Sequence, residues 1–247
     1  MLVHGWGMHC GFWREFAIAL AANYRVTCVD LPGHGRSAAI EDYRPENIAT
    51  LLAHSTPDKA HWIGWSLGAT LVLFLAGLFP ERVKSIGLIA ANPKFSQDED
   101  WPHAIKHEVL DQFNRNLIEN FKPTLFRFLK VQTLGMESPR QSYRILKKRL
   151  NESTAPQPDA LSAGVRTLKF ADRRKQLESL EKPILAILGA KDSLVPVGVG
   201  DALSRLNPSI ECRIIPNAGH IPFFTHRSQC LAEVVRFLRK QTANRDA

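Results

Sequence analysis

The feature that most constrains this chain is a serine between two glycines, where an apolar strand pattern changes to a helical one. Residues 60–64 form a short β-rich run, and residues 67–79 have the length and composition of a helix. The motif GWSLG, residues 64–68, joins them. A serine on such a sharp turn projects its hydroxyl from the carboxyl edge of a sheet, beside helix N–H groups that stabilise an oxyanion. The pattern predicts that Ser66 is a nucleophile; a plain glycine-rich helix cap is the simpler alternative.

Short apolar runs on both sides of this motif predict the other strands of a sheet. They span residues 25–30, 83–90, 184–189 and 211–215. The apolar spacing over residues 228–240 predicts a closing helix. Strands that alternate with helices indicate an α/β fold with a mainly parallel, doubly wound sheet.

The middle of the chain, about residues 101–179, has no strand pattern. Helical patterns cover residues 107–121, 123–132, 139–151 and 160–170 instead. This arrangement indicates a helical cap inserted into the sheet rather than a second domain with its own core. We therefore expect a single domain over residues 1–247.

A nucleophilic serine needs a base to remove its proton, and the base needs a carboxylate to orient it. Asp192 follows the strand expected at 184–189, and His220 follows the strand expected at 211–215. The carboxyl ends of parallel strands meet at one edge of a sheet, where open α/β sheets hold their sites. The order Ser66, Asp192, His220 therefore predicts a catalytic triad.

The oxyanion formed during such catalysis needs backbone donors from two places. The loop His4–Gly7 (HGWG) follows an apolar pair at the start of the chain. We expect the N–H groups of Trp6 and Leu67 to be the two donors. His4 and His34 are expected to hold turns rather than to catalyse.

The positive charge is concentrated in the cap. The chain carries 32 Lys and Arg against 24 Asp and Glu, a net charge of +8. Residues 103–175 hold 15 Lys and Arg and 7 Asp and Glu, which accounts for the whole excess. A solvated helical surface explains such a segment, and so does a docking face for an acidic partner. Nucleic acid is a weak alternative, because no nucleic-acid-binding motif accompanies the charge.

The remaining composition bears on the compartment and on cofactors. The longest apolar runs fall far short of the roughly 20 residues of a membrane span, so no membrane partner is expected. The chain opens without a recognisable secretory signal. Its four cysteines form neither a CxxC pair nor a cluster, which predicts no disulfide framework and no zinc site. We expect a cytoplasmic protein.

Several motifs together resemble the α/β-hydrolase superfamily. They are residues 4–7 (HGWG), 30–37 (DLPGHGRS), 64–68 (GWSLG), 80–83 (PERV) and 219–223 (GHIPF), with Asp192. Within it, the chain is similar to the pimeloyl-[acyl-carrier protein] methyl ester esterases of biotin synthesis. That likeness rests on residues 92–96 (NPKFS), 101–102 (WP), 128–133 (FLKVQT) and 140–148 (RQSYRILKK).

The resemblance implies a serine carboxylesterase that removes the methyl group masking the carboxylate of a carrier-bound pimeloyl chain. It implies Ser66 as nucleophile, His220 as base and Asp192 as its partner, without a metal or organic cofactor. It also implies a monomer. Phe128, Leu129, Lys130, Val131 and Gln132 would line the acyl channel, and Arg127, Arg140 and Arg144 would meet the acidic carrier protein. Another basic carrier contact of the family falls at Pro123, so that contact is not expected here, although Lys122 lies beside it.

The start of the chain departs from the family. The family begins with two further strands, and its HGWG motif follows a complete third strand, whereas Met1 stands three residues before His4. About 16 residues are missing relative to that pattern. We therefore expect either a longer native protein or a less stable one, since a shortened interior strand leaves ladder groups unpaired.

Three other functions share these residues. A broad-specificity short-chain carboxylesterase needs the same triad, and only the basic cap argues against it. A C–C bond hydrolase of aromatic degradation uses the same triad on another substrate. A ligand receptor with the same fold would retain the triad without turnover.

Overall fold

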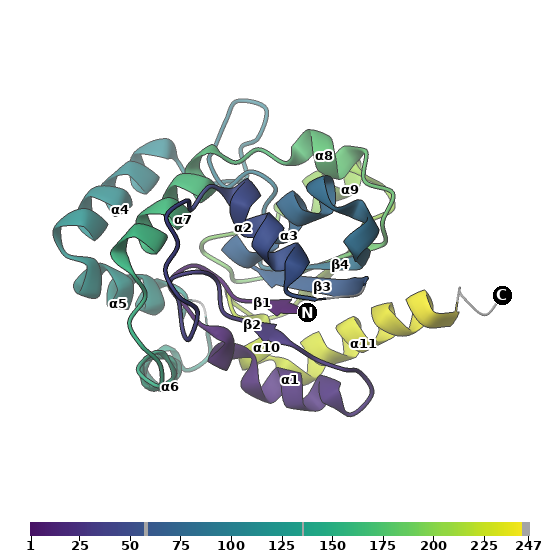
Figure 1. The fold of residues 1–247 in the computed structure, drawn as a ribbon, viewed down its shortest axis with the longest axis horizontal. Helices are drawn as coiled ribbons and strands as arrows, with labels where there is room; N and C mark the ends of the chain where they lie inside the picture. Colours follow the sequence, from purple (N-terminus) through teal and green to yellow (C-terminus); the bar gives the residue numbers. More distant parts are fainter. Residues whose placement is uncertain (57–58, 135, 244–247) are drawn as a thin grey trace.

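A parallel sheet forms the centre of the molecule (Figure 1). The computed structural model describes residues 1–56, 59–134 and 136–243. Over these residues the sheet has six strands in the order β2-β1-β3-β4-β5-β6, and all neighbours are parallel. The strands are β1 (Leu2–Val3), β2 (Cys28–Val29), β3 (Ala60–Trp65), β4 (Val83–Ile89), β5 (Ile184–Gly189) and β6 (Glu211–Ile215).

Helices cover both faces of the sheet, as a doubly wound fold requires (Figure 1). One layer contains α2 (Pro45–His54), α3 (Leu67–Leu78) and α9 (Val199–Leu206). The other layer contains α1 (Arg14–Ala21), α10 (Pro222–Thr225) and α11 (Arg227–Ala243). Two short 3₁₀ helices, η1 (Cys10–Trp13) and η2 (Pro80–Arg82), lie in the connections. α3 is buried along nearly its whole length, which explains why its sequence is apolar on all sides.

Five helices of the described residues lie between β4 and β5 and form the cap. It consists of α4 (His107–Glu119), α5 (Phe121–Val131), α6 (Pro139–Leu150), α7 (Pro158–Phe170) and α8 (Arg174–Glu178). The helix α4 packs against α5 and α7, and these three lie beyond the end of the sheet in Figure 1. No helix in the described part of the chain is long and apolar enough to cross a bilayer.

The predicted strands are confirmed, with one shortened. The strands expected at 60–64, 83–90, 184–189 and 211–215 end within one residue of their predicted bounds. The run 25–30 forms only the two-residue strand β2, because its partner in the sheet, β1, is itself two residues long. The short helices α1, α2 and α9 were not predicted from the sequence.

Salt bridges fasten the two ends of the cap insertion to each other. The Lys94 ammonium lies 2.7 Å from Asp98 and 3.4 Å from Asp172, and Arg174 binds the Asp172 carboxylate with two nitrogens. Partial burial raises the pKa of Asp172, but the hydrogen bonds from Arg174 outweigh it and bring this pKa to about 2. The carboxylate is therefore charged at neutral pH, and the cap leaves and rejoins the sheet at one fixed point.

Two buried histidines hold the loops at the amino-terminal side of the site. His4 accepts a hydrogen bond from the Leu31 N–H at Nε2 (3.0 Å) and donates from Nδ1 to the Gly5 carbonyl (2.8 Å). The His34 ring lies 5.3 Å from it. Burial lowers the pKa of His4 to about 3 and that of His34 to about 4, so both are neutral at neutral pH. The expectation that they support turns is confirmed.

The lowered pKa values of His4 and His34 predict that the folded protein is less stable in mild acid. Their pKa values are lower in the folded chain than in the unfolded chain, which therefore binds more protons below about pH 6.5. We expect the free energy of unfolding, measured with urea, to fall as the pH is lowered from about 6.5 to about 5. The variant His34→Phe should show a shallower fall, because one of the two groups is gone. Equal slopes for the two proteins would contradict this assignment.

Candidate active site

Ser66 sits on a strained turn between β3 and α3. Its φ is +53° and its ψ −120°, a backbone conformation that a residue with a side chain rarely adopts. The two glycines of the motif make the turn possible. A Cβ on Gly64 would lie 2.4 Å from the backbone of Ala69, and one on Gly68 would lie 2.4 Å from the His4 carbonyl oxygen. The strand, the helix and the first loop of the chain therefore converge on Ser66.

Asp192 and His220 form a buried pair at the same edge of the sheet. The Nδ1 of His220 donates to Oδ2 of Asp192 over 2.8 Å, and both side chains are almost fully buried. The other carboxylate oxygen accepts from the N–H groups of Leu194 and Val195, at 2.8 and 3.0 Å. Three hydrogen bonds therefore fix the carboxylate, which in turn fixes the tautomer and the orientation of the imidazole.

His220 lies in the wall of the cavity that contains Ser66. Both residues line this cavity, whose volume is about 170 Å³ and whose walls are almost entirely apolar. Nε2 of His220 is buried and has no hydrogen-bond partner among the described residues. The serine–histidine hydrogen bond is thus not formed in this structure, and such bonds are often long before substrate binds. A ring nitrogen without a described partner, in the same cavity as the serine, is the acceptor that a general base must supply.

Two N–H groups beside Ser66 are free to bind an oxyanion. Within the part of the chain that the structure covers, neither Trp6 nor Leu67 donates its N–H to any acceptor. A Cβ on Gly5 would lie 3.4 Å from Cβ of Ser66, so the loop that carries the Trp6 amide runs directly along the serine. The Trp6 indole holds that loop in place by donating to the Leu161 carbonyl of α7 (2.8 Å).

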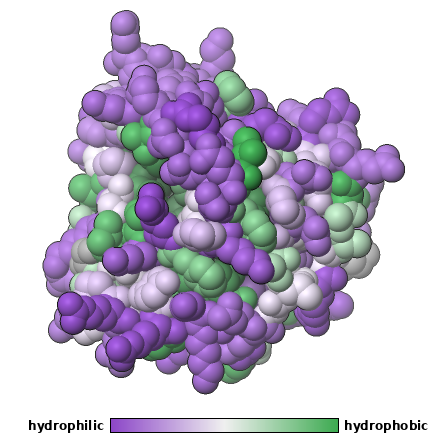
Figure 2. Space-filling view, turned by 90° about the vertical axis from the view of Figure 1, so that its left-hand side faces the viewer, coloured by the Kyte–Doolittle hydropathy of each residue, from purple (hydrophilic) through white to green (hydrophobic). Residues whose placement is uncertain are grey.

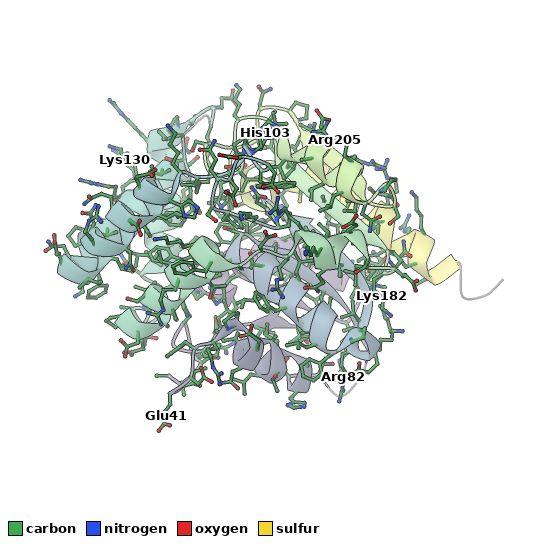
Figure 3. The ribbon with its side chains drawn as sticks, turned by 90° about the horizontal axis from the view of Figure 1, so that it is seen from above. Glu41, Arg82, His103, Lys130, Lys182 and Arg205 are labelled. Carbon is green, nitrogen blue, oxygen red and sulfur yellow. The ribbon has the colours of Figure 1, made fainter. Side chains whose placement is uncertain are left out.

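Only one face of α5 reaches the cavity. Arg127, Phe128 and Val131 line it, and these three positions share one side of a helix. Leu129 is buried among other cap residues, and Lys130 is exposed on the outer side of the cap (Figure 3). Neither is among the lining residues. The expected run of five lining residues is therefore split by the helical period.

Gln132 lies apart from the cavity but next to the catalytic loop. Its backbone carbonyl oxygen is 3.6 Å from the position that a Cβ on Gly219 would take. The side chain is 1% exposed, and neither atom of its amide group has a hydrogen-bond partner in the described chain. The structure thus places the backbone of Gln132 beside the loop of His220, and the buried side-chain amide is unsatisfied among the described residues.

The rest of the cavity wall was not predicted from the sequence. These residues are apolar, belong to the cap or to loops at the sheet edge, and carry no motif that separates them from other core residues. They are Phe95, Ile105, Val109, Leu110, Phe113, Val165, Leu168 and Leu194. Trp6, Phe113 and Phe128 form an aromatic cluster with ring centroids 5.0 to 5.6 Å apart.

The cap surface above the cavity is basic. Arg140 and Arg144 lie exposed on α6, four residues apart on one face of the helix. Among the Lys and Arg side chains of α4, α5 and α6, Arg149 is the one that forms an ion pair within the described residues. Figure 2 shows this side of the molecule, where an apolar centre is surrounded and crossed by hydrophilic side chains. These three helices therefore present exposed cations that have no acidic partner within the described part of the chain.

Comparison with known proteins agrees with this architecture. A family model described as the alpha/beta hydrolase fold matches residues 1–227. The chain is 37% identical over 238 residues to the pimeloyl-[acyl-carrier protein] methyl ester esterase of Methylococcus capsulatus, covering 96% of this chain and 93% of that protein. It is 38% identical over 237 residues to the protein of the same name from Pectobacterium atrosepticum, covering 96% and 92%.

Solved structures share the fold at lower identity. An esterase from Exiguobacterium antarcticum superposes with a TM-score of 0.85 at 17% identity, covering 96% of this chain and 91% of that chain. A bromoperoxidase from Bacillus anthracis gives a TM-score of 0.82 at 22% identity, covering 96% and 90%. The fold, the family match and the relatives together show that the chain belongs to the α/β-hydrolase family, among the pimeloyl-[acyl-carrier protein] methyl ester esterases.

Proposed function

We propose that this protein hydrolyses the methyl ester of pimeloyl-[acyl-carrier protein] and frees the pimeloyl carboxylate for biotin synthesis. One observation carries the proposal: Ser66 and His220, which is paired with buried Asp192, line an apolar cavity beneath a cap whose exposed cations on α4, α5 and α6 have no acidic partner among the described residues. The apolar walls suit an acyl chain. The unpaired cations suit an acidic carrier protein, and the relatives at 37% and 38% identity carry the name of this activity.

The first half of the reaction forms an acyl-enzyme. Oγ of Ser66 attacks the methyl ester carbonyl carbon while Nε2 of His220 takes the hydroxyl proton. The charge on the carbonyl oxygen is stabilised by the N–H groups of Trp6 and Leu67. As the carbonyl reforms, the bond to methoxide breaks, and His220 returns its proton to give methanol. Asp192 stabilises the imidazolium between these two proton transfers.

The second half releases the product. Nε2 of His220 takes a proton from water, and the hydroxide attacks the ester carbon bound to Ser66. The same two N–H groups stabilise the second oxyanion. Collapse breaks the bond to Oγ, which recovers its proton from His220, and the free carboxylate leaves with the carrier. In both halves of the reaction, Nε2 of His220 accepts the proton and then returns it.

In this proposal the cap binds the carrier protein. Arg127 lies on the cavity wall with no ion pair in the described residues, so it marks the side at which a charged carrier would meet the acyl entrance. Arg140 and Arg144 extend the basic surface onto α6. Guanidinium groups bind carboxylates in a bidentate manner, which suits the acidic helices of a carrier protein. Phe128 and Val131 would contact the acyl chain, and Gln132 is proposed to act beside them.

A broad-specificity carboxylesterase is the second candidate. The observation that favours it is the apolar cavity itself: apart from Ser66 and His220, Arg127 is the one polar side chain that the described residues offer for recognising the far end of a substrate. Relative kcat/KM on a carrier-linked methyl ester and on p-nitrophenyl butyrate distinguishes the two candidates. A preference for the carrier-linked ester supports the proposal, and a preference for the free ester supports the alternative.

We further propose that the protein acts as a monomer in the cytoplasm. All four cysteines are free thiols, as is usual in a reducing compartment. Size-exclusion chromatography with light scattering measures the mass in solution, and a mass near 27.7 kDa is expected. A stable dimer would contradict the monomer.

Removing the nucleophile should abolish ester hydrolysis without affecting the fold. Ser66→Ala is expected to lower kcat by about 10⁶-fold, as for other triad nucleophiles. His220→Ala should be nearly as severe, and Asp192→Asn less so, because the imidazole loses its preferred tautomer. Steady-state assays with circular dichroism as the fold control measure this. More than a few per cent of residual activity in Ser66→Ala would show that another group attacks.

Reversing the cap charges should impair the carrier substrate selectively. Exposed ion pairs are worth about 0.2–1 kcal/mol each, and a reversal adds repulsion, so Arg127, Arg140 and Arg144 changed together to Glu should lower kcat/KM by about tenfold or more. The wild-type value should fall steeply with added salt. The double variant Arg140→Glu/Arg144→Glu leaves the cavity wall unchanged, so hydrolysis of p-nitrophenyl butyrate should stay at the wild-type rate.

Cations away from the cap provide the matched control. Lys182 and Arg205 lie on the other side of the molecule from Lys130 in Figure 3. Changing these two residues to Glu alters the net charge as much as the double cap variant does. If both double variants lose the same activity on the carrier substrate, the effect comes from net charge and the cap is not the docking face.

A further inference from the structure

Arg149 is the exception among the cations of α6, because its side chain is buried. It is 8% exposed, whereas its neighbours Lys147 and Lys148 are exposed. Its guanidinium donates to the Glu15 carboxylate of α1 (2.5 Å) and to the Gly11 carbonyl of η1 (3.3 Å). Burying a charged group is costly unless it is paired and hydrogen-bonded, so this arginine has a specific structural task.

A closed set of hydrogen bonds joins Arg149 to the segment that follows the oxyanion loop. The Gly11 N–H donates to Nδ1 of His9 (3.1 Å), so the proton of the neutral ring is on Nε2. That nitrogen donates to the Arg149 carbonyl oxygen (2.9 Å), and the Arg149 guanidinium returns to the Gly11 carbonyl. Burial lowers the pKa of His9, which keeps the ring neutral at neutral pH. The backbone and the side chain of one α6 residue are therefore both held.

The segment that binds Arg149, residues 9–13, is held in place by contacts that do not involve Arg149. His9 comes two residues after the loop His4–Gly7, whose Trp6 indole is bonded to α7 and whose Gly5 carbonyl accepts from the Met8 N–H (3.3 Å). Phe12 and Trp13, in η1, are fully buried in the core. The loop with the proposed oxyanion donor and the segment after it are therefore held in place by the core. Arg149 bonds α6 to that segment.

We propose that Arg149 is a positioning residue that holds the carrier-docking helix α6 in register with the oxyanion loop. This inference rests on the proposed function, since it assigns a role to the helix that carries Arg140 and Arg144. Both of these lie within nine residues of Arg149 on α6, a helix that also packs against α5 and η1. A carrier bound to the outer part of α6 delivers its acyl chain to Ser66 only if the helix keeps one position relative to the site.

The test compares variants by hydrogen exchange and by kinetics. Arg149→Met removes the charge and every side-chain hydrogen bond, and Arg149→Lys restores the charge but cannot serve Glu15 and Gly11 with a planar fork. Glu15→Ala weakens the same contact from the other, more exposed side and keeps the test available if Arg149→Met does not fold. Arg14→Met is the matched control, because Arg14 pairs with Glu152 in the same cluster but holds no backbone group of the oxyanion segment.

We expect the amides of α6 to exchange faster in Arg149→Met, while those of α5 and α7 exchange as in the wild type. On the carrier-linked methyl ester, KM should rise by about tenfold, the size expected when two or three exposed ion pairs no longer form. The value of kcat/KM on p-nitrophenyl butyrate should stay within twofold of the wild type. Arg149→Lys should recover part of the loss, Glu15→Ala should shift in the same direction, and Arg14→Met should behave as the wild type.

Three results would overturn the inference. Unchanged exchange in α6 would show that Arg149 does not hold the helix, and an equal loss on both substrates would show a general effect on the fold. Faster exchange with an unchanged KM for the carrier substrate would show that the position of α6 does not matter for docking. Failure of the proposed function is a separate outcome, since the wild type itself would then not hydrolyse the carrier-linked ester.

Discussion

The backbone at Ser66 is the constraint on which the site depends. A positive φ at a residue with a side chain costs on the order of 1–3 kcal/mol, and it persists only where the surroundings enforce it. Here the enforcement comes from β3, α3 and the loop after β1, which approach so closely that Gly64 and Gly68 cannot carry a Cβ. The same approach brings the free amides of Trp6 and Leu67 beside the serine. The strain at Ser66, its proposed role as nucleophile and the proposed oxyanion donors therefore depend on one packing arrangement.

The sheet and the cap contribute different parts of the site. The carboxyl edge of the sheet holds Ser66, Asp192 and His220, each fixed by backbone or buried hydrogen bonds. The cap supplies most of the apolar cavity wall and the unpaired cations. It is fastened to the sheet at the Lys94–Asp172 junction and, through Arg149, at the segment after the oxyanion loop. Under the proposed function, the sheet would provide the reacting groups and the cap the features that select a substrate.

Sequence reasoning found the residues whose chemistry has a fixed spacing or a fixed place at the sheet edge. Ser66, Asp192 and His220 follow predicted strands; Ser66 and His220 line one cavity, and buried Asp192 is bound to Nδ1 of His220. It did not find the cavity wall, because Phe113 or Leu194 looks like any other core residue until its neighbours are known. The sequence predicts that all of residues 128–132 line the channel, whereas a helix turns only every third or fourth residue toward one side. Arg149 was hidden among exposed cations, since burial of one arginine in a basic helix leaves no sequence signal.

The most direct test of the proposed reaction is the mass of the acyl-enzyme formed on the carrier substrate. A sample quenched in acid during the first turnover, then analysed by intact mass and peptide mapping, shows which carbonyl was attacked. Hydrolysis of the methyl ester predicts a covalent adduct at Ser66 that still contains the whole carrier protein, because methanol is the leaving group. An adduct that contains only the methyl pimeloyl group would mean attack at the thioester that links the chain to the carrier. That result, or an adduct at another residue, would contradict the account.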